Sequence, residues 1–217
     1  MKQQKKEYVV QIIERLKAQY PLAECSLDYD EAWKLLVSVR LAAQCTDARV
    51  NEIVPKLYEK FPTMEAIATA DVEEIEQIVR PCGLGRSKAK DIKYCMDMLI
   101  KEYGGVVPDN MEDLLKLPGV GRKSANLIVG DVYHKPPIVT DTHCIRLSNR
   151  LGLVKNEKDP KKVEDALWKL IPPEEGNGLC HRFVDHGREV CTARTAPYCE
   201  RCCLSDLCDY YKREMRN

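Results

Sequence analysis

The sequence predicts an all-α protein, and three observations support this fold class. Apolar residues recur at positions i, i+3, i+4 and i+7 along nearly all of the 217 residues, whereas strands would show alternation. Short loops marked by proline, glycine and capping residues separate these stripes. No strand-rich segment, low-complexity segment or repeat array interrupts them. A chain of this length forms one large domain or two small ones.

A series of apolar stripes defines the predicted helices in chain order. Each stripe marks one helical face, and such a face is expected to pack in a core. The stripes are Val9–Tyr20, Ala32–Val39, Val72–Val79, Ala89–Tyr103, Leu114–Leu117, Ala125–Val132, Ile145–Leu151 and Val163–Ile171.

Residues at the helix ends support these assignments. Thr46, Asp47 and Asp71 are typical N-cap residues, and Gly152 is typical of a position just after a helix ends. Pro55 falls inside a helical pattern, so we expect a kink or a break there.

The overall charge is balanced, with 34 basic and 34 acidic residues. This balance counts against a protein that coats DNA non-specifically, because such proteins are usually basic. The basic N-terminus is followed by amphipathic sequence, so we expect no signal peptide. No apolar run is long enough to span a membrane. We therefore expect a cytoplasmic protein.

The chain contains eleven cysteines, an odd and high number. Without a secretory signal, reduced thiols and a metal site are favoured over disulfides. Scattered cysteines are expected to be structural, and Cys45 and Cys95 fall within helical patterns. The scattered set is Cys25, Cys45, Cys82, Cys95, Cys144 and Cys180.

The remaining cysteines crowd into one segment near the C-terminus. Four of them, Cys191, Cys199, Cys202 and Cys208, are separated by seven, two and five residues, and Cys203 is a spare. Close thiolates bind Zn²⁺ or an iron–sulfur cluster. Zinc ribbons usually contain two Cys-x2-Cys pairs and this segment contains one, which favours iron–sulfur, although zinc remains open.

The run Leu117–Ala125 is the most informative local sequence. A helix expected over Met111–Leu117 ends at Pro118, two glycines form a tight turn, and a second helix starts near Lys123. The free N–H groups of such a turn bind anions. A primary amine then lies beside a bound phosphate, and we expect it to be partly buried. Taken alone, the run is equally typical of an ordinary helical corner with a surface lysine.

A carboxylate follows this second helix after a proline-containing loop. The next helix is expected to start around Thr142, which puts Asp141 at its N-terminus. The helix dipole stabilises a carboxylate at this end. Simple capping explains most aspartates in such positions, but a capping residue beside a reactive lysine has a second possible role in catalysis.

Together these features resemble the endonuclease III family of DNA glycosylases, in the helix–hairpin–helix superfamily. The resemblance covers nearly the whole chain, and its specificity comes from the order of several motifs. In order, these are Leu41–Asp47, Gly83–Ala89, Leu117–Ala125, Val139–His143 with Arg146, His186–Arg188 and the cysteine segment.

The resemblance implies two helical lobes with a DNA-binding cleft between them. One is a six-helix barrel domain that carries the helix–hairpin–helix motif, over residues 25–135. The other is a discontinuous iron–sulfur cluster domain, made of residues 1–24 and 136–217.

The resemblance also implies roles for individual residues. Lys123 corresponds to the nucleophile and Asp141 to the catalytic aspartate. Gln44 matches the residue that fills the gap left by an extruded nucleotide, and Leu84 matches the wedge that enters the stack. The implied DNA-contacting residues are Gln44, Leu84, Gly119, Val120, Gly121, Arg122 and His143.

The implied cofactor is a [4Fe–4S] cluster on Cys191, Cys199, Cys202 and Cys208. The chain departs from the family pattern here, because seven residues rather than the usual six separate the first two ligands. A loop insertion can absorb the difference, or the adjacent Cys203 competes as a ligand.

The implied function is base excision repair by a bifunctional DNA glycosylase and AP lyase that removes oxidised pyrimidines. Its partner is double-stranded DNA with a damaged base or an abasic site, and the protein acts as a monomer, associated with the nucleoid through DNA. Two alternatives remain: a glycosylase for mismatched or oxidised purines, and a non-catalytic DNA-binding module that uses an iron–sulfur cluster for redox sensing.

Overall fold

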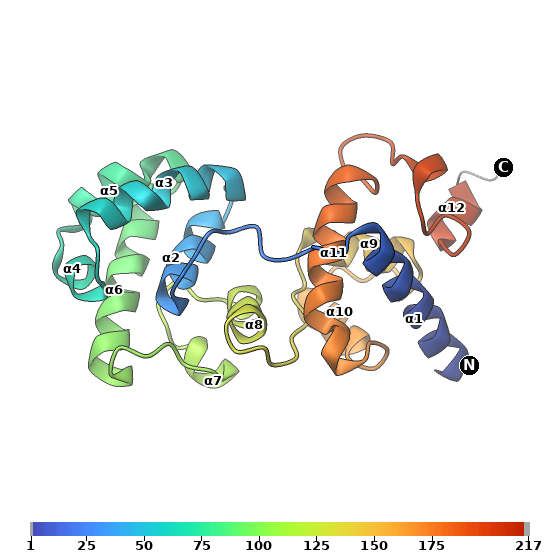
Figure 1. Ribbon diagram of the computed structural model, residues 1–217, viewed down its shortest axis with the longest axis horizontal. Helices are drawn as coiled ribbons and strands as arrows, with labels where there is room; N and C mark the ends of the chain where they lie inside the picture. Colours follow the sequence, from blue (N-terminus) through green and yellow to red (C-terminus); the bar gives the residue numbers. More distant parts are fainter. Residues whose placement is uncertain (1, 215–217) are drawn as a thin grey trace. The chain divides into compact units, whose positions relative to one another are not determined.

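The computed structural model describes residues 2–214, and its secondary structure is helical, with no strand in that range (Figure 1). The all-α prediction is confirmed. The α-helices are α1 (Lys2–Gln19), α2 (Ala32–Ala42), α3 (Asp47–Lys60), α4 (Met64–Thr69), α5 (Val72–Val79), α6 (Gly85–Tyr103), α7 (Met111–Leu114), α8 (Arg122–Asp131), α9 (Thr142–Arg150), α10 (Pro160–Leu167), α11 (Gly176–Glu189) and α12 (Asp209–Glu214). The 3-10 helices are η1 (Arg80–Cys82), η2 (Pro173–Glu175) and η3 (Cys199–Arg201).

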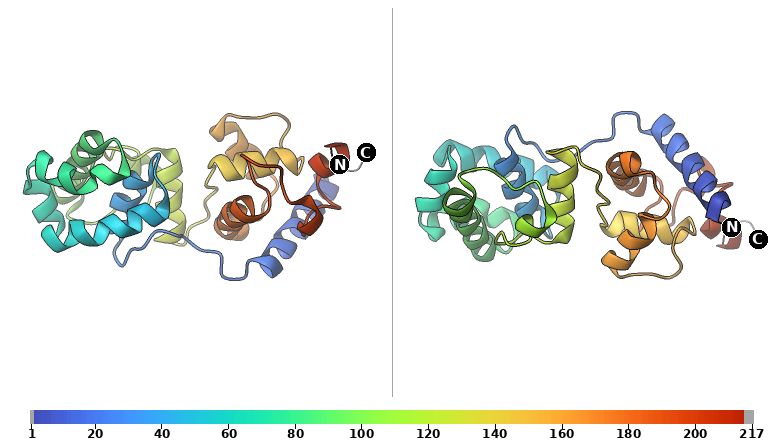
Figure 2. Two further views of the ribbon diagram at one scale, coloured as in Figure 1. Left: turned by 90° about the horizontal axis from the view of Figure 1, so that it is seen from above. Right: turned by 90° about the horizontal axis from the view of Figure 1, so that it is seen from below.

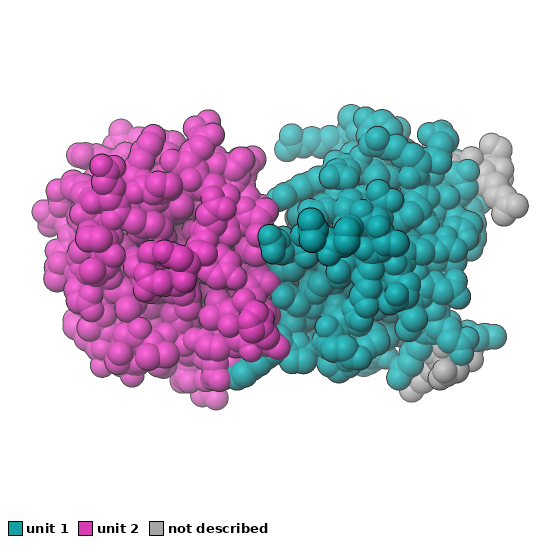
Figure 3. All heavy atoms as spheres, viewed as in Figure 1, with its two compact units in different colours: residues 1–24, 135–217 teal, residues 25–134 magenta. Residues whose placement is uncertain are grey.

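The chain divides into two compact units (Figure 3). Unit 1 combines the N-terminal segment up to Glu24 with the chain from Lys135 onward, and unit 2 is Cys25–His134. Among the described helices, none is both long enough and apolar enough to cross a membrane.

Helix α6 organises the core of unit 2 (Figures 1 and 2). It packs against α2, α4 and α5, while α8 packs against α2 and α7. The stripe predicted within Ala89–Tyr103 supplies the buried face of α6, as Ala89, Ile92, Met96 and Leu99 are all at most 1% exposed. The helical period therefore identified the core side of this helix correctly.

Helix α11 has the corresponding position in unit 1, where it packs against α1 and α9. Helix α9 in turn contacts α10 and α12. Phe183 of α11 is fully buried, as are Val9, Ile12 and Leu16 of α1. The N-terminal helix thus completes a core that is otherwise built from the C-terminal part of the chain.

The structure confirms several helix ends. Thr46 caps α3 by accepting a hydrogen bond from the Arg49 amide (3.3 Å), and Gly152 takes a left-handed conformation (φ 74°) just after α9. Asp71 is at the N-cap of α5 but its side chain makes no capping bond. Helix α3 continues through Pro55, so no break occurs. A proline removes one backbone hydrogen bond, and the buried face of α3 holds the helix together across it.

Three expectations in unit 2 were wrong. The helix expected over Met111–Leu117 is only the single turn α7, and Leu115, assigned to the core, is 43% exposed. Both errors come from a segment too short to establish a period, in which Pro118 stops further growth. Cys45 lies in the turn between α2 and α3 and not within a helix.

The turn that contains Gly119 rests on an ion pair. The guanidinium of Arg40 in α2 donates to Asp91 of α6 through Nε (2.7 Å) and Nη2 (2.6 Å), and Nη2 also lies 3.3 Å from the Ser87 hydroxyl. Gly119 has a left-handed backbone (φ 76°). A Cβ added there would lie 2.7 Å from Arg40 Cδ and 2.9 Å from Asp91 Cβ. Both its conformation and its close approach therefore require glycine at this position.

We predict that Tyr8→Phe destabilises the protein by about 1–3 kcal/mol, because it removes a donor from two carbonyls. The Tyr8 hydroxyl donates to the carbonyls of Leu151 (2.7 Å) and Leu207 (2.9 Å), which ties α1 to the end of α9 and to the segment before α12. Burial raises the pKa of Tyr8, so the hydroxyl keeps its proton at neutral pH. Urea denaturation measures the change, and Tyr94→Phe, at an exposed tyrosine, is the matched control.

We predict that Gly119→Ala lowers the free energy of unfolding by about 2–4 kcal/mol, from left-handed backbone strain and overpacking against Arg40. The matched control is Gly121→Ala, because Gly121 has φ −97° and no atom lies within 4 Å of an added Cβ. Urea denaturation of both variants tests the contrast. An equal loss of stability in the two variants would show that packing of Gly119 against the Arg40–Asp91 ion pair does not require glycine.

Candidate active site

The turn between α7 and α8 presents free backbone amides at a helix N-terminus. The Val120 amide bonds to the Leu117 carbonyl (3.1 Å), which closes the turn, and Gly121 is the N-cap of α8. The first amides of a helix have no partner within it. Gly121 has no side chain with which to cap them, and Gly119 and Gly121 are both exposed. These amides can therefore bind an anion such as a phosphate by donating hydrogen bonds to it.

Lys123 is the second residue of α8 and is exposed. The prediction that a helix starts near this residue is confirmed, but the expected partial burial is not observed. Arg122 precedes it and is half-buried, as is Val120 in the turn. The primary amine of Lys123 is thus accessible to a ligand held at the N-terminus of α8.

Gln44 and Leu84 share an unusual backbone conformation in unit 2. Both residues lie in the left-handed region, with φ values of 58° and 50°, and both are exposed. Leu84 leaves 56% of its surface in contact with solvent although its side chain is apolar. Left-handed backbone costs roughly 1–2 kcal/mol in a non-glycine residue. Exposed and strained side chains of this kind are typical of functional positions rather than of packing.

Asp141 lies in unit 1 and caps α9. Its Oδ1 accepts a hydrogen bond from the Cys144 amide (2.7 Å), which confirms the predicted helix start. The carboxylate is half-buried. Capping occupies one carboxylate oxygen, and the second oxygen remains a possible acceptor or base.

Two residues of α9 approach α11 closely. His143 Nδ1 lies 3.2 Å from Arg146 Nη2, and that guanidinium also donates to the carbonyls of Gly187 (3.0 Å) and Cys191 (3.0 Å). A Cβ on Gly187 would lie 2.3 Å from His143 Nδ1, so only glycine fits there. Arg146 therefore fixes α9 against the end of α11, where the cysteine segment begins.

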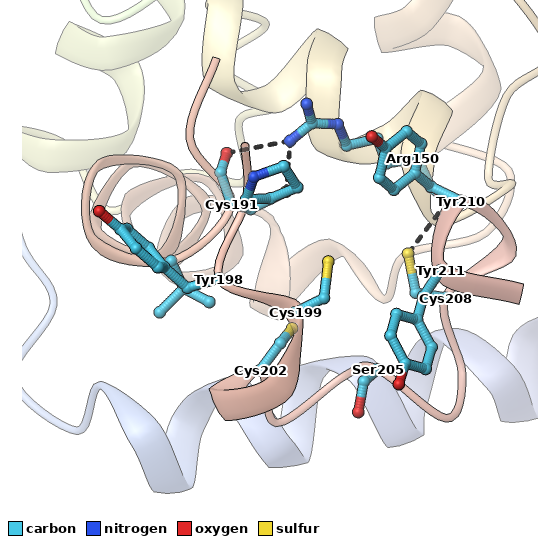
Figure 4. A pocket seen from close by; sticks show the side chains of 11 residues that line it. Arg150, Cys191, Tyr198, Cys199, Cys202, Ser205, Cys208, Tyr210 and Tyr211 are labelled. Carbon is cyan, nitrogen blue, oxygen red and sulfur yellow. Dashed lines mark hydrogen bonds between the residues drawn. The ribbon is translucent and has the colours of Figure 1, made fainter. Parts of the chain in front are cut away.

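The four predicted ligand cysteines line one pocket in unit 1 (Figure 4). Figure 4 shows the sulfur atoms of Cys199, Cys202 and Cys208 around this space. Arg150 Nη1 lies 3.0 Å from the Cys191 sulfur and also donates to the Thr192 carbonyl (2.9 Å). The sequence analysis missed Arg150 as a partner of this pocket.

His186 contacts one of the cysteines that line this pocket. Its Nε2 is 3.4 Å from the Cys202 sulfur, and its Nδ1 is 3.2 Å from the Tyr20 hydroxyl. The ring is 2% exposed, and burial lowers the pKa of His186 to about 4. The backbone amide of Leu204 also points to the Cys202 sulfur (3.4 Å).

The lining of this pocket fits a thiolate-bound centre. Within residues 2–214, no group of three or more histidine, cysteine or acidic side chains is arranged to hold one metal ion. Four thiols share this pocket, and N–H donors are directed at the Cys191 and Cys202 sulfurs, as is typical of thiolates that hold a metal centre. Cys203 does not line this pocket, so it is not placed as a competing ligand.

Sequence reasoning also missed Lys88, which is completely buried at the start of α6. Its ammonium donates to the carbonyls of Leu41 and Cys82, each at 2.7 Å. A signal was present, because Lys88 precedes Ile92 by four residues and so falls on the apolar stripe of its own helix.

Comparison with known proteins provides independent information. Residues 37–173 match the family model described as HhH-GPD superfamily base excision DNA repair protein. Endonuclease III of Synechocystis sp. is 44% identical over 205 residues, which cover 94% of this chain and 93% of that relative. Endonuclease III of Bacillus subtilis is 39% identical over 196 residues, covering 90% and 89%.

Solved structures give the same result. A non-covalent endonuclease III–DNA complex matches with a TM-score of 0.92 and 40% identity, covering 98% of this chain and 99% of the other. A trapped endonuclease III–DNA covalent intermediate matches with a TM-score of 0.91 and 40% identity, covering 97% and 99%. The chain therefore belongs to the endonuclease III family, base excision repair DNA glycosylases of the HhH-GPD superfamily.

Proposed function

We propose that this protein is a bifunctional DNA glycosylase and AP lyase that removes oxidised pyrimidines from double-stranded DNA as a monomer. The observation that carries the proposal is the exposed Lys123 amine in the first turn of α8, directly after a turn with free amides. A related endonuclease III has been trapped in a covalent intermediate with DNA, which supports covalent chemistry for this chain.

The target nucleotide must first leave the duplex, because stacking hides its sugar carbon. Gln44 and Leu84 are suited to hold the distorted duplex, since both side chains are exposed on strained turns. The amides of Gly119 and Gly121 would bind backbone phosphate, with Arg122 beside them. The Val120 amide would shape this site indirectly, because it closes the turn by bonding to the Leu117 carbonyl. These contacts position the DNA without reading its sequence.

Lys123 then attacks C1′ with the lone pair of its amine nitrogen. The new carbon–nitrogen bond forms as the glycosidic bond breaks, and the base leaves with the bonding electron pair and acquires a proton. Asp141 would stabilise the positive charge that develops on the sugar and assist proton transfer. His143 would contact DNA near Asp141.

Strand cleavage follows from the imine that Lys123 forms when the C1′–O4′ bond breaks and the ring oxygen takes up a proton, which opens the sugar. Loss of a proton from C2′ and departure of the 3′ phosphate, with breakage of its bond to C3′, constitute β-elimination. Water then hydrolyses the imine and regenerates the amine. Only a primary amine forms this imine, so lysine at position 123 predicts lyase activity in addition to base removal.

We also propose that Cys191, Cys199, Cys202 and Cys208 hold a [4Fe–4S] cluster. Such a cluster would cross-link the end of α11, the 3-10 helix η3 and the start of α12. Within the fold, Arg146 and Arg150 connect this loop to α9, the helix that carries Asp141. The ligand residues would thus support the loop without taking part in a chemical step.

Lys123→Ala is expected to abolish trapping by borohydride, because alanine forms no imine with the sugar. Purified protein is incubated with a duplex that contains thymine glycol or an abasic site, and the reduced protein–DNA adduct is measured. Lys161→Ala, at an exposed lysine of α10, serves as the control and should be trapped like the wild type. An adduct of undiminished yield in Lys123→Ala would refute the assignment of the nucleophile.

Cys199→Ser is expected to remove iron and the broad visible absorption of a [4Fe–4S] cluster from protein purified without oxygen. Cys203→Ser is the matched control, because Cys203 is a close neighbour in the sequence but does not line the pocket. Iron analysis and absorption spectra of both variants provide the measurement. Retained iron in Cys199→Ser, or zinc in the wild type, would exclude the proposed ligand set or the proposed metal.

A further inference from the structure

Lys88 is the most completely buried cation described in the chain. Its exposed fraction is 0%, and it lies in the first turn of α6, four residues after Leu84. Burial of an ammonium group costs several kcal/mol unless hydrogen bonds replace its hydration. A methionine or leucine would fill the same space at lower cost, so filling the core does not account for a lysine here.

The partners of the Lys88 ammonium belong to two different segments. Nζ donates to the Leu41 carbonyl at 2.7 Å and to the Cys82 carbonyl at 2.7 Å. Leu41 is in the last turn of α2, where carbonyls lack helical partners and the helix dipole favours a cation. Cys82 ends the 3-10 helix η1. One side chain thus connects the end of α2 to the end of η1.

These hydrogen bonds are made to carbonyl dipoles and not to a thiolate. Burial, together with the neighbouring Cys45 thiol, raises the pKa of Cys82 to about 11. The Cys82 thiol is therefore neutral at physiological pH. The geometry of the two carbonyls, rather than an ion pair, determines where the ammonium lies.

Each of the two carbonyls lies just before a strained and exposed residue. Gln44 follows Leu41 by three residues, a span of at most ~11 Å, and Leu84 follows Cys82 by two, at most ~7 Å. Gln44 and Leu84 are the left-handed residues proposed above to enter the duplex. With α2 and η1 tied to one ammonium, neither turn can move relative to the other without breaking a buried hydrogen bond.

We propose that Lys88 is a positioning residue that sets the spacing of Gln44 and Leu84 and thereby adapts the enzyme to duplex DNA. This inference rests on the proposed function, in which those two side chains hold a duplex from which a nucleotide has been extruded. Imine chemistry at Lys123 does not itself require a complementary strand. Lys88 should therefore matter for abasic sites in duplexes and much less for abasic sites in single strands.

The test is Lys88→Met, which replaces the apolar stem of the side chain with one of similar shape and removes its donors. Single-turnover nicking is measured for one abasic oligonucleotide, alone and annealed to its complement. We expect the rate on the duplex to fall by about 10- to 100-fold, because displacement of positioning groups by about 1 Å has effects of this size. The rate on the single strand should stay within about twofold, so that the ratio of the two rates falls.

Two controls test whether a change in this ratio comes from Lys88 acting through Gln44 and Leu84. Lys90→Met changes an exposed lysine two residues further along α6 and should leave both rates unchanged. In a Gln44→Ala, Leu84→Ala background, Lys88→Met should cause little further loss on the duplex, because the residues through which it acts are already absent. An unchanged duplex-to-single-strand ratio in Lys88→Met, or full additivity in the double background, would overturn the proposal.

Folding of each variant is checked by circular dichroism and thermal melting. If Lys88→Met does not fold, Lys88→Leu, which also lacks the donors, is measured in its place, and failure of both to fold assigns Lys88 to stability alone and overturns the proposal. Wild-type protein that nicks neither substrate would refute the proposed lyase function. Wild-type nicking with an unchanged ratio in the variant would refute only the role of Lys88.

Discussion

Unpaired backbone groups at helix ends are the constraint on which the functional residues of this protein depend. Each α-helix leaves amides at its start and carbonyls at its end that need partners. Gln44 follows the end of α2, Leu84 precedes α6, and Lys123 lies in the first turn of α8. Asp141 caps α9. In an all-α chain, the helix ends are where backbone polar groups are available to a ligand, and the residues proposed to act on DNA lie there.

These helix ends differ in what satisfies their backbone groups. Side chains of the protein satisfy two of them, and one is left for a ligand. The start of α9 is satisfied by the Asp141 side chain, and the end of α2 by the Lys88 ammonium. The start of α8 has only Gly121 as its N-cap, which has no side chain to offer. A phosphate from outside can therefore take the place of a cap at α8. Arg40 and Asp91 support the conformation of this turn, because Gly119 packs directly against them.

Sequence alone predicted the features that depend on local order along the chain. The fold class, the buried faces and the caps at Thr46 and Asp141 follow from helical period and from hydrogen bonding within a few residues. Other features depend on contacts between distant segments and were missed. Two examples are the hydrogen bond from Lys88 to the Leu41 carbonyl and the contact of Arg150 with the Cys191 sulfur. No local sequence pattern predicts either contact. The length of α7 was overestimated because Leu114–Leu117 is too short to define a period.

The two glycine turns of unit 2 show how one residue of register separates a buried lysine from an exposed one. Gly83–Ala89 and Gly119–Ala125 both place a glycine pair before an arginine and end on an alanine that is fully buried. Counting back from that alanine, Lys88 is adjacent to it and Lys123 is one residue further away. Each helical residue turns by about 100°, so the lysine of α6 points to the core and the lysine of α8 points to solvent. In α6 the amine donates to two backbone carbonyls, and in α8 it is exposed to solvent, as the proposed covalent chemistry requires.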